Sequence, residues 1–215
     1  MCYNGGQEGW ILERVDNYAL QAKQAKQHFL TYDQNALIAK LDLQQDSEYL
    51  YVNLLCQLYR INRKTGDMHR RLGESWVAAD SHSEVMTLLD LVCDSRRDRY
   101  ITGRWKNMQS FGRLFHSGLL EKERDPFALR FDGDPESLHR ACRALGGKAL
   151  PGADICYSVP FFEGLCICIQ FWHGDDEFSP RIRYLWDENA DRYLKYETMY
   201  FAVNLLHTRM KDALE

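Results

Sequence analysis

The sequence predicts an α+β fold in which an antiparallel sheet, formed by an N-terminal hairpin and a C-terminal three-strand meander, packs with amphipathic helices. Residues 49–62 and 153–187 contain the apolar–polar alternation that is typical of strands. Elsewhere, apolar residues recur at the three- and four-residue steps of a helix. The strand and helix segments are grouped rather than alternating, which favours α+β over α/β. Because no linker or internal repeat interrupts the 215 residues, we expect one domain over 1–215.

The N-terminal third is predicted to hold two helices and a small sheet. Residues 7–30 have a helical apolar stripe, and Asp33 is a suitable N-cap for a short helix that ends near Leu41. Residues 49–62 are predicted to be one strand with a β-bulge near Leu58–Tyr59, because the parity of the apolar positions switches there. A turn at residues 64–67 predicts that the chain returns over 68–72, and residues 76–79 form a third short strand.

The middle of the chain is predicted to be helical. Ser81 and Glu84 have the spacing of a capping box, which starts a helix extending to about Val92. Residues 107–120 are predicted to form the next helix, with Phe111, Leu114 and Phe115 facing inward. A further helix starts at Asp134-Pro135 and ends at Gly146-Gly147.

The C-terminal third is predicted to be a meander followed by a long helix. Residues 153–160, 165–172 and 181–187 have strand character, and their short connections favour antiparallel pairing. Residues 195–214 carry a continuous apolar stripe with helical spacing.

The composition and the sequence give no support for a nucleic-acid-binding, membrane-spanning or secreted protein. The chain has 27 Lys+Arg and 31 Asp+Glu, and this net charge of −4 gives no overall attraction to nucleic acid or to an anionic membrane. There is no apolar run of membrane-spanning length, and the first residues do not resemble a signal peptide, so we expect a cytoplasmic protein. The odd number of cysteines, seven, favours reduced thiols.

The cysteines of the predicted meander are candidate metal ligands. Cys166 and Cys168 alternate along one strand, which places both thiols on one face roughly 7 Å apart. A simple hairpin would turn Cys156 to the opposite face, so no three-thiolate site is expected. We therefore interpret these cysteines as small hydrophobic core residues and predict no metal site.

Acidic and aromatic residues of the meander are the candidate ligand-binding residues. They are Trp172, Asp175, Asp176, Glu177, Trp186, Asp187, Glu188 and Asn189. The first four adjoin one strand connection, while the others end the last strand roughly 20 Å away, so they could form two patches rather than one. The alternative is an enzyme that uses Asp175, Asp176 and Glu177 for cation binding or general acid/base chemistry. The basic stretch 96–106 is interpreted as a solvated helix end.

Several motifs resemble a prokaryotic family of unknown function, DUF3786. They are Gly147-Lys148-Ala149-Leu150-Pro151-Gly152-Ala153-Asp154, Pro160-Phe161-Phe162, Gln170-Phe171-Trp172, Asp175-Asp176-Glu177-Phe178-Ser179-Pro180-Arg181, Leu185-Trp186-Asp187-Glu188-Asn189 and Tyr196-Glu197-Thr198, with Thr102-Gly103-Arg104-Trp105 upstream. The resemblance implies one α+β domain without an established activity. Similar proteins that carry an N-terminal cysteine-rich iron–sulfur segment imply a redox partner, but this chain has only Cys2 there. We therefore expect a non-enzymatic accessory domain that binds a small molecule or an iron–sulfur or other redox protein, with no identified cofactor.

Overall fold

The strands form two separate five-stranded antiparallel sheets, which confirms the α+β class and shows that the two strand groups do not join. The computed structural model describes residues 17–112 and 125–215. The first sheet has the order β1-β2-β3-β4-β5 and the second has the order β6-β10-β9-β8-β7. Their bounds are β1 Gln44–Gln45, β2 Tyr49–Leu54, β3 Gln57–Asn62, β4 Met68–Leu72, β5 Ser75–Ala78, β6 Trp105–Asn107, β7 Lys148–Ala149, β8 Ile155–Phe162, β9 Leu165–Trp172 and β10 Arg181–Asp187.

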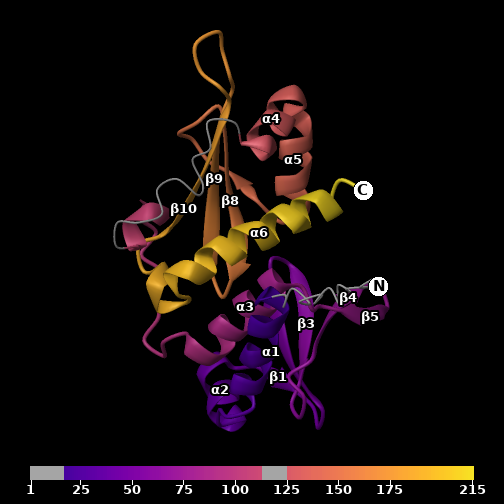
Figure 1. Cartoon of the computed structure of the whole chain (residues 1–215). Helices are drawn as coiled ribbons and strands as arrows, with labels where there is room; N and C mark the ends of the chain where they lie inside the picture. The colour runs from indigo at the N-terminus through magenta and orange to yellow at the C-terminus, as the bar shows by residue number, and fades with distance from the viewer. Residues whose placement is uncertain (1–16, 113–124) are drawn as a thin grey trace, which may run out of the picture.

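Helices cover the sheets and connect the two halves of the molecule. They are α1 Asn17–Phe29, α2 Gln34–Leu41, α3 His82–Leu89, the π-helix η1 Asp90–Asp94, the 3-10 helices η2 Met108–Phe111 and η3 Ala190–Arg192, α4 Pro126–Gly133, α5 Pro135–Ala144 and α6 Tyr196–Asp212. Figure 1 shows α1, α2 and α3 beside the first sheet, α4 and α5 beside the second, and α6 crossing between the halves. The buried apolar side chains of both halves form one cluster, which gives the sheets a shared core.

Most predicted helix starts are confirmed by their caps. The Asp33 carboxylate accepts hydrogen bonds from the backbone N–H groups of residues 35 and 36 at the start of α2. Ser81 Oγ accepts from the N–H of Glu84 at the start of α3, and Asp134 caps α5 in the same way. The predicted first helix is confirmed from Asn17 onward, while residues 7–16 lie outside the described residues. Helix α4, which follows the N-cap Asp125, was not predicted from the sequence.

The predicted bulge in residues 49–62 is wrong, because the chain reverses there. Leu54 pairs with Gln57, so β2 and β3 form a hairpin around a two-residue turn at Leu55 and Cys56. These two residues have φ angles of 50° and 57°, the left-handed conformation that such a turn requires. The buried residues of β2 have even numbers, and across a two-residue turn they pair with odd-numbered residues of β3. This accounts for the switch in the apolar pattern.

The predicted helix over 107–120 is also wrong where the structure describes it. Trp105–Asn107 form β6, which pairs with β10, and η2 then extends only to Phe111. The ring of Tyr196 lies against Gly112, where an added Cβ would come within 2.3 Å of it. This close approach ties the segment to α6. Leu114 and Phe115 lie outside the described residues.

The predicted orientation of Cys156 is wrong because β8 carries an irregularity near its end. Phe162 pairs with Leu165, but Pro160 pairs with Cys166, so one residue is added in β8 between these pairs. The addition turns Cys156 to the same face as Cys168, and their Sγ atoms lie 3.7 Å apart. Burial raises the pKa of both thiols, and it raises that of the neighbouring Cys142 to about 12. These three cysteines are buried core thiols, whereas Cys166 is partly exposed.

Candidate functional site

The residues predicted to bind a ligand lie at opposite ends of β10 and form two groups. Arg181 at the start of β10 pairs with Trp172, whereas Trp186 near its end pairs with Ile167. Trp172 and the loop over residues 173–180 therefore lie at one end of the strand, and residues 186–189 lie at the other. Figure 1 shows that loop as a long projection beyond the helices.

The acidic loop points its side chains into solvent. The Asp175 carboxylate accepts the backbone N–H groups of Glu177 and Phe178 at 2.9 and 2.7 Å, which lowers its pKa and closes the turn. Asp176 and Glu177 are exposed, and Phe178 is 70% exposed. In the described part of the chain, no group of three or more His, Cys, Asp or Glu side chains is arranged to hold a metal. The loop therefore gives no geometric support to the enzyme alternative.

The other end of β10 is occupied by structural contacts. Trp186 is fully buried, and its ring packs edge-on against Phe161 with ring centroids 5.2 Å apart. The buried Asp187 carboxylate accepts the N–H and the hydroxyl of Thr102 and the N–H groups of Gly103 and Asn189, at 2.7–3.1 Å. With these acceptor positions filled, Asp187 anchors the loop before β6 instead of offering a free carboxylate.

The basic stretch 96–106 is not a helix end, because η1 ends at Asp94 and the following chain is irregular up to β6. Two of its arginines pair with acidic residues from the second half of the chain, and a third pairs with Asp98 inside the stretch. Arg99 donates to Glu163, Arg104 pairs with Glu188, and Asp98 accepts from both Arg96 and Arg192. Three arginines of the stretch thus have acidic partners, and Glu188 is used in this pairing.

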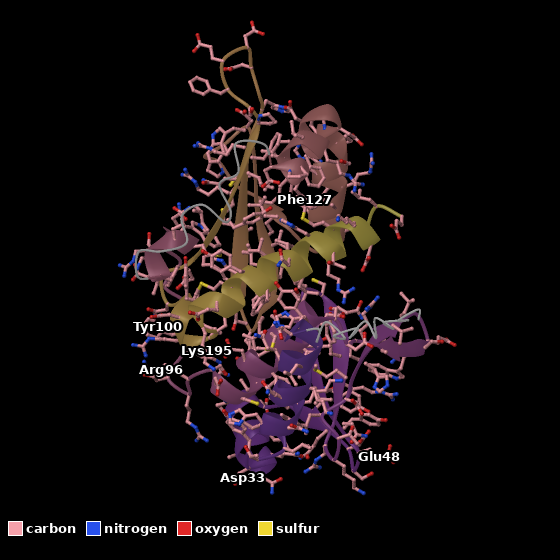
Figure 2. The ribbon with its side chains drawn as sticks, viewed as in Figure 1. Asp33, Glu48, Arg96, Tyr100, Phe127 and Lys195 are labelled. Carbon is pink, nitrogen blue, oxygen red and sulfur yellow. The ribbon has the colours of Figure 1, made fainter. Side chains whose placement is uncertain are left out.

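The candidate site is an open cavity of about 380 Å³ that the sequence analysis did not predict. It lies where α1, α3 with η1, and the first turns of α6 meet, and we call it the α1–α6 cavity. Its lining residues are Gln21, Gln24, Ala25, His28, Met86, Leu89, Asp90, Cys93, Asp94, Lys195, Glu197, Thr198 and Phe201. Figure 2 labels Lys195 where α6 begins.

The cavity has an apolar wall and an acidic end. Met86, Leu89 and Phe201 provide the apolar wall, and Asp90 and Asp94 of η1 provide the acidic end. A π-helix is rare, and it is frequently found at functional sites. Asp90 and Asp94 both point toward Lys195, so this turn places two carboxylates beside a single ammonium group.

Asp90 is the most unusual residue of the acidic end. Its side chain is 4% exposed, and one carboxylate oxygen, Oδ2, accepts the backbone N–H of Lys195 at 2.7 Å. The other oxygen, Oδ1, is buried and accepts no hydrogen bond in the described structure. Lys195 Nζ is 3.3 Å from Oδ1, close enough for ionic attraction but without hydrogen-bond geometry. A buried carboxylate oxygen without a donor is energetically costly and unusual.

The groups around Asp94 are fixed in their charge states. Hydrogen bonds from Lys195 and from the Tyr32 hydroxyl, which lies 2.5 Å away, outweigh the effect of burial and lower the pKa of Asp94. The bond to Asp94 also raises the pKa of Lys195. Burial raises the pKa of the Cys93 thiol to about 12. At neutral pH the acidic end therefore holds a carboxylate, an ammonium and a neutral thiol that is not activated as a nucleophile.

Sequence reasoning missed this cavity because its residues form no motif. Asp90 and Asp94 are four residues apart, which would place them on one face of a regular helix, and this was the one signal available. Lys195 is distant in sequence, and it reaches them because α3 packs against α6. The cavity depends on this tertiary contact.

These observations define an α+β protein with two antiparallel sheets and a cavity between its helices. A family model described as a domain of unknown function, DUF3786, matches residues 33–209 of the chain. The chain belongs to the DUF3786 family. No curated protein and no solved structure matches it. Within residues 17–112 and 125–215, no helix combines the length and apolar character that crossing a bilayer requires. The matched range includes Asp90, Asp94 and Lys195, whereas α1 precedes it.

Proposed function

We propose that this protein binds a small organic molecule in the α1–α6 cavity. The observation that carries the proposal is the buried Oδ1 of Asp90, which accepts no hydrogen bond from the described residues, at the end of a cavity with an apolar wall. Binding sites for small molecules commonly have about 300–1,000 Å³, a mainly apolar lining and a few polar groups that orient the ligand. The α1–α6 cavity meets each of these criteria.

The proposal keeps the binding role expected from the sequence, but it places the binding site in the α1–α6 cavity instead of at the ends of β10. The acidic loop is exposed, and the Asp187 carboxylate already has its hydrogen-bond partners, so neither end of β10 offers a carboxylate oxygen that lacks a donor beside an apolar wall. The α1–α6 cavity offers both. A ligand there would contact α1, η1 and α6 at once, and its binding would stabilise the packing of these helices.

The test is to block the cavity and follow ligand binding by NMR. The probes are benzylamine, benzyl alcohol and benzoate at millimolar concentration, and the readout is backbone amide shifts of the full chain. We expect at least one probe to shift amides of α1, η1 and the start of α6. Ala25→Trp places a ring inside the cavity and should abolish these shifts. Gln27→Trp adds the same ring to an exposed position of α1 that does not line the cavity, so it should preserve them.

Two results would contradict the proposal. One is that none of the three probes shifts any amide at the cavity. The other is that the shifts survive in Ala25→Trp, because binding would then occur elsewhere on the molecule.

A further inference from the structure

We infer that the ligand of the α1–α6 cavity carries a positively charged amine, whose ammonium group binds the buried carboxylate of Asp90. This inference rests on the proposed function and specifies the chemical class of the ligand. It follows from the charge of the cavity, from the hydrogen bonds around Asp90 and from the apolar wall opposite.

The charge of the lining favours a cation. Asp90, Asp94 and Glu197 contribute three carboxylates, and Lys195 contributes one ammonium, so these groups sum to −2. The Lys195 side chain is 62% exposed, and its ammonium lies closer to Asp94 than to Asp90. The only lysine of the lining is therefore shared between two acids, and a cationic ligand would supply the missing positive charge.

The hydrogen bonds of Asp90 indicate that the cationic group of the ligand also donates hydrogen bonds. Oδ2 already accepts the N–H of Lys195, which fixes the carboxylate at the start of α6. Oδ1 is left without a donor although it is buried. A primary ammonium has three N–H donors, so it can satisfy Oδ1 and still bind a second acceptor. A charge-assisted bond of this kind is stronger than a neutral one.

The surroundings favour an organic ammonium over a metal ion. The described residues bring no set of three His, Cys, Asp or Glu ligands together, so a divalent cation would find at most two such protein ligands here. Met86, Leu89 and Phe201 form the apolar wall beside the acids, and burial of a hydrocarbon body there is favourable. The Phe201 side chain also offers an aromatic ring, which attracts organic cations through its face.

The experiment compares probes of similar shape and different charge. Affinities of benzylamine, benzyl alcohol and benzoate are measured on the full chain by NMR titration at neutral pH, where benzylamine is protonated. We expect benzylamine to bind about tenfold or more tightly than benzyl alcohol, and benzoate to bind most weakly, because a hydrogen bond to a charged group contributes this much.

Variants of the carboxylates locate the interaction. Asp90→Asn keeps an acceptor for the N–H of Lys195 but removes the charge, so the preference for benzylamine should largely disappear. The control is Asp98→Asn, which removes an exposed acid that does not line the cavity and should leave the preference unchanged. If Asp90→Asn does not fold, the order of affinities in the unmodified protein still tests the inference.

The outcomes separate the inference from the proposed function. Binding of benzyl alcohol or benzoate as tightly as benzylamine would overturn the ammonium inference and leave a ligand cavity. A preference for benzylamine that persists in Asp90→Asn would overturn the role of Asp90. Absence of binding by all three probes would overturn the proposed function and the inference with it.

Discussion

Glu84 of α3 and Arg209 of the last helix, α6, form a buried ion pair that joins these two helices. Arg209 Nη2 donates to Glu84 Oε1 at 2.6 Å, and each side chain is 5% exposed. The Tyr59 hydroxyl accepts from Arg209 at 2.5 Å and donates to Glu84, while Arg70 and Ser81 also bind the Glu84 carboxylate. This network fixes α6 against α3 and β3, and α6 in turn forms one wall of the α1–α6 cavity.

Removing the charge of Glu84 should destabilise the protein strongly. Glu84→Gln removes the buried carboxylate partner of Arg209 and leaves the guanidinium only the exposed Asp212 as an acidic partner among the described residues. Breaking a buried pair costs about 3–5 kcal/mol. Urea unfolding measures the loss. The control is Glu136→Gln, whose partner Arg143 is 3.5 Å away in an exposed pair, and it should cost less than about 1 kcal/mol. Equal losses in the two variants would show that the Glu84 pair contributes no more than a surface pair.

The sequence was sufficient to predict elements whose signals are local. Asp33, Ser81 and Asp134 cap helices because each side chain accepts an N–H two or three residues further on, so a short stretch of sequence carries the signal. The strands β8, β9 and β10 were also predicted close to their bounds. The pattern of apolar residues within each strand is enough to predict it, without information from distant parts of the chain.

The errors arose where tertiary structure sets the local geometry. Leu55 and Cys56 form a left-handed turn without the Gly or Asn that usually marks one, so the β2–β3 hairpin was interpreted as a single bulged strand. The extra residue in β8 turns Cys156 toward Cys168, and no sequence pattern predicts this extra residue. The α1–α6 cavity was missed for the same reason, because Lys195 reaches Asp90 only after α6 has packed on α3.

Protonation of His207 should weaken the fold at acidic pH. The Tyr184 hydroxyl hydrogen-bonds to His207 Nε2, and Phe127 stacks on the imidazole with ring centroids 3.9 Å apart. Burial lowers the pKa of His207 from 6.5 to about 4. Between these two values the unfolded chain binds a proton that the folded chain does not, so stability falls as the pH is lowered through this window.

The size of this effect is on the order of 3–4 kcal/mol, since each pKa unit corresponds to about 1.4 kcal/mol. His207→Gln keeps an acceptor for Tyr184 but cannot take up the proton. Its unfolding free energy should therefore fall less steeply between pH 6.5 and pH 4 than that of the unmodified protein. Parallel pH profiles of the two proteins would exclude this role for His207.

Asp187 should act as a structural anchor rather than as a ligand-binding residue. Asp187→Ala would remove the acceptor of the N–H groups of Thr102 and Gly103, and a hydrogen bond to a charged group contributes about 1.5–3 kcal/mol. Amide hydrogen exchange at these two residues should accelerate. Asp176→Ala, in the exposed loop, should change stability by less than about 0.5 kcal/mol. Unchanged exchange at Thr102 and Gly103 would contradict the anchoring role.

The β2–β3 turn should be improved by glycine at position 56. Cys56 has a φ of 57°, and a left-handed conformation costs an L-residue roughly 1–2 kcal/mol that glycine avoids. Cys56→Gly should therefore raise the unfolding free energy by up to about 1 kcal/mol. Cys56→Val should lower it, because a β-branched side chain is the least compatible with this conformation. The thiol also donates to the carbonyl of Leu145 at 3.3 Å. If Cys56→Gly is less stable than the unmodified protein, this contact between the two halves contributes more than the turn geometry costs.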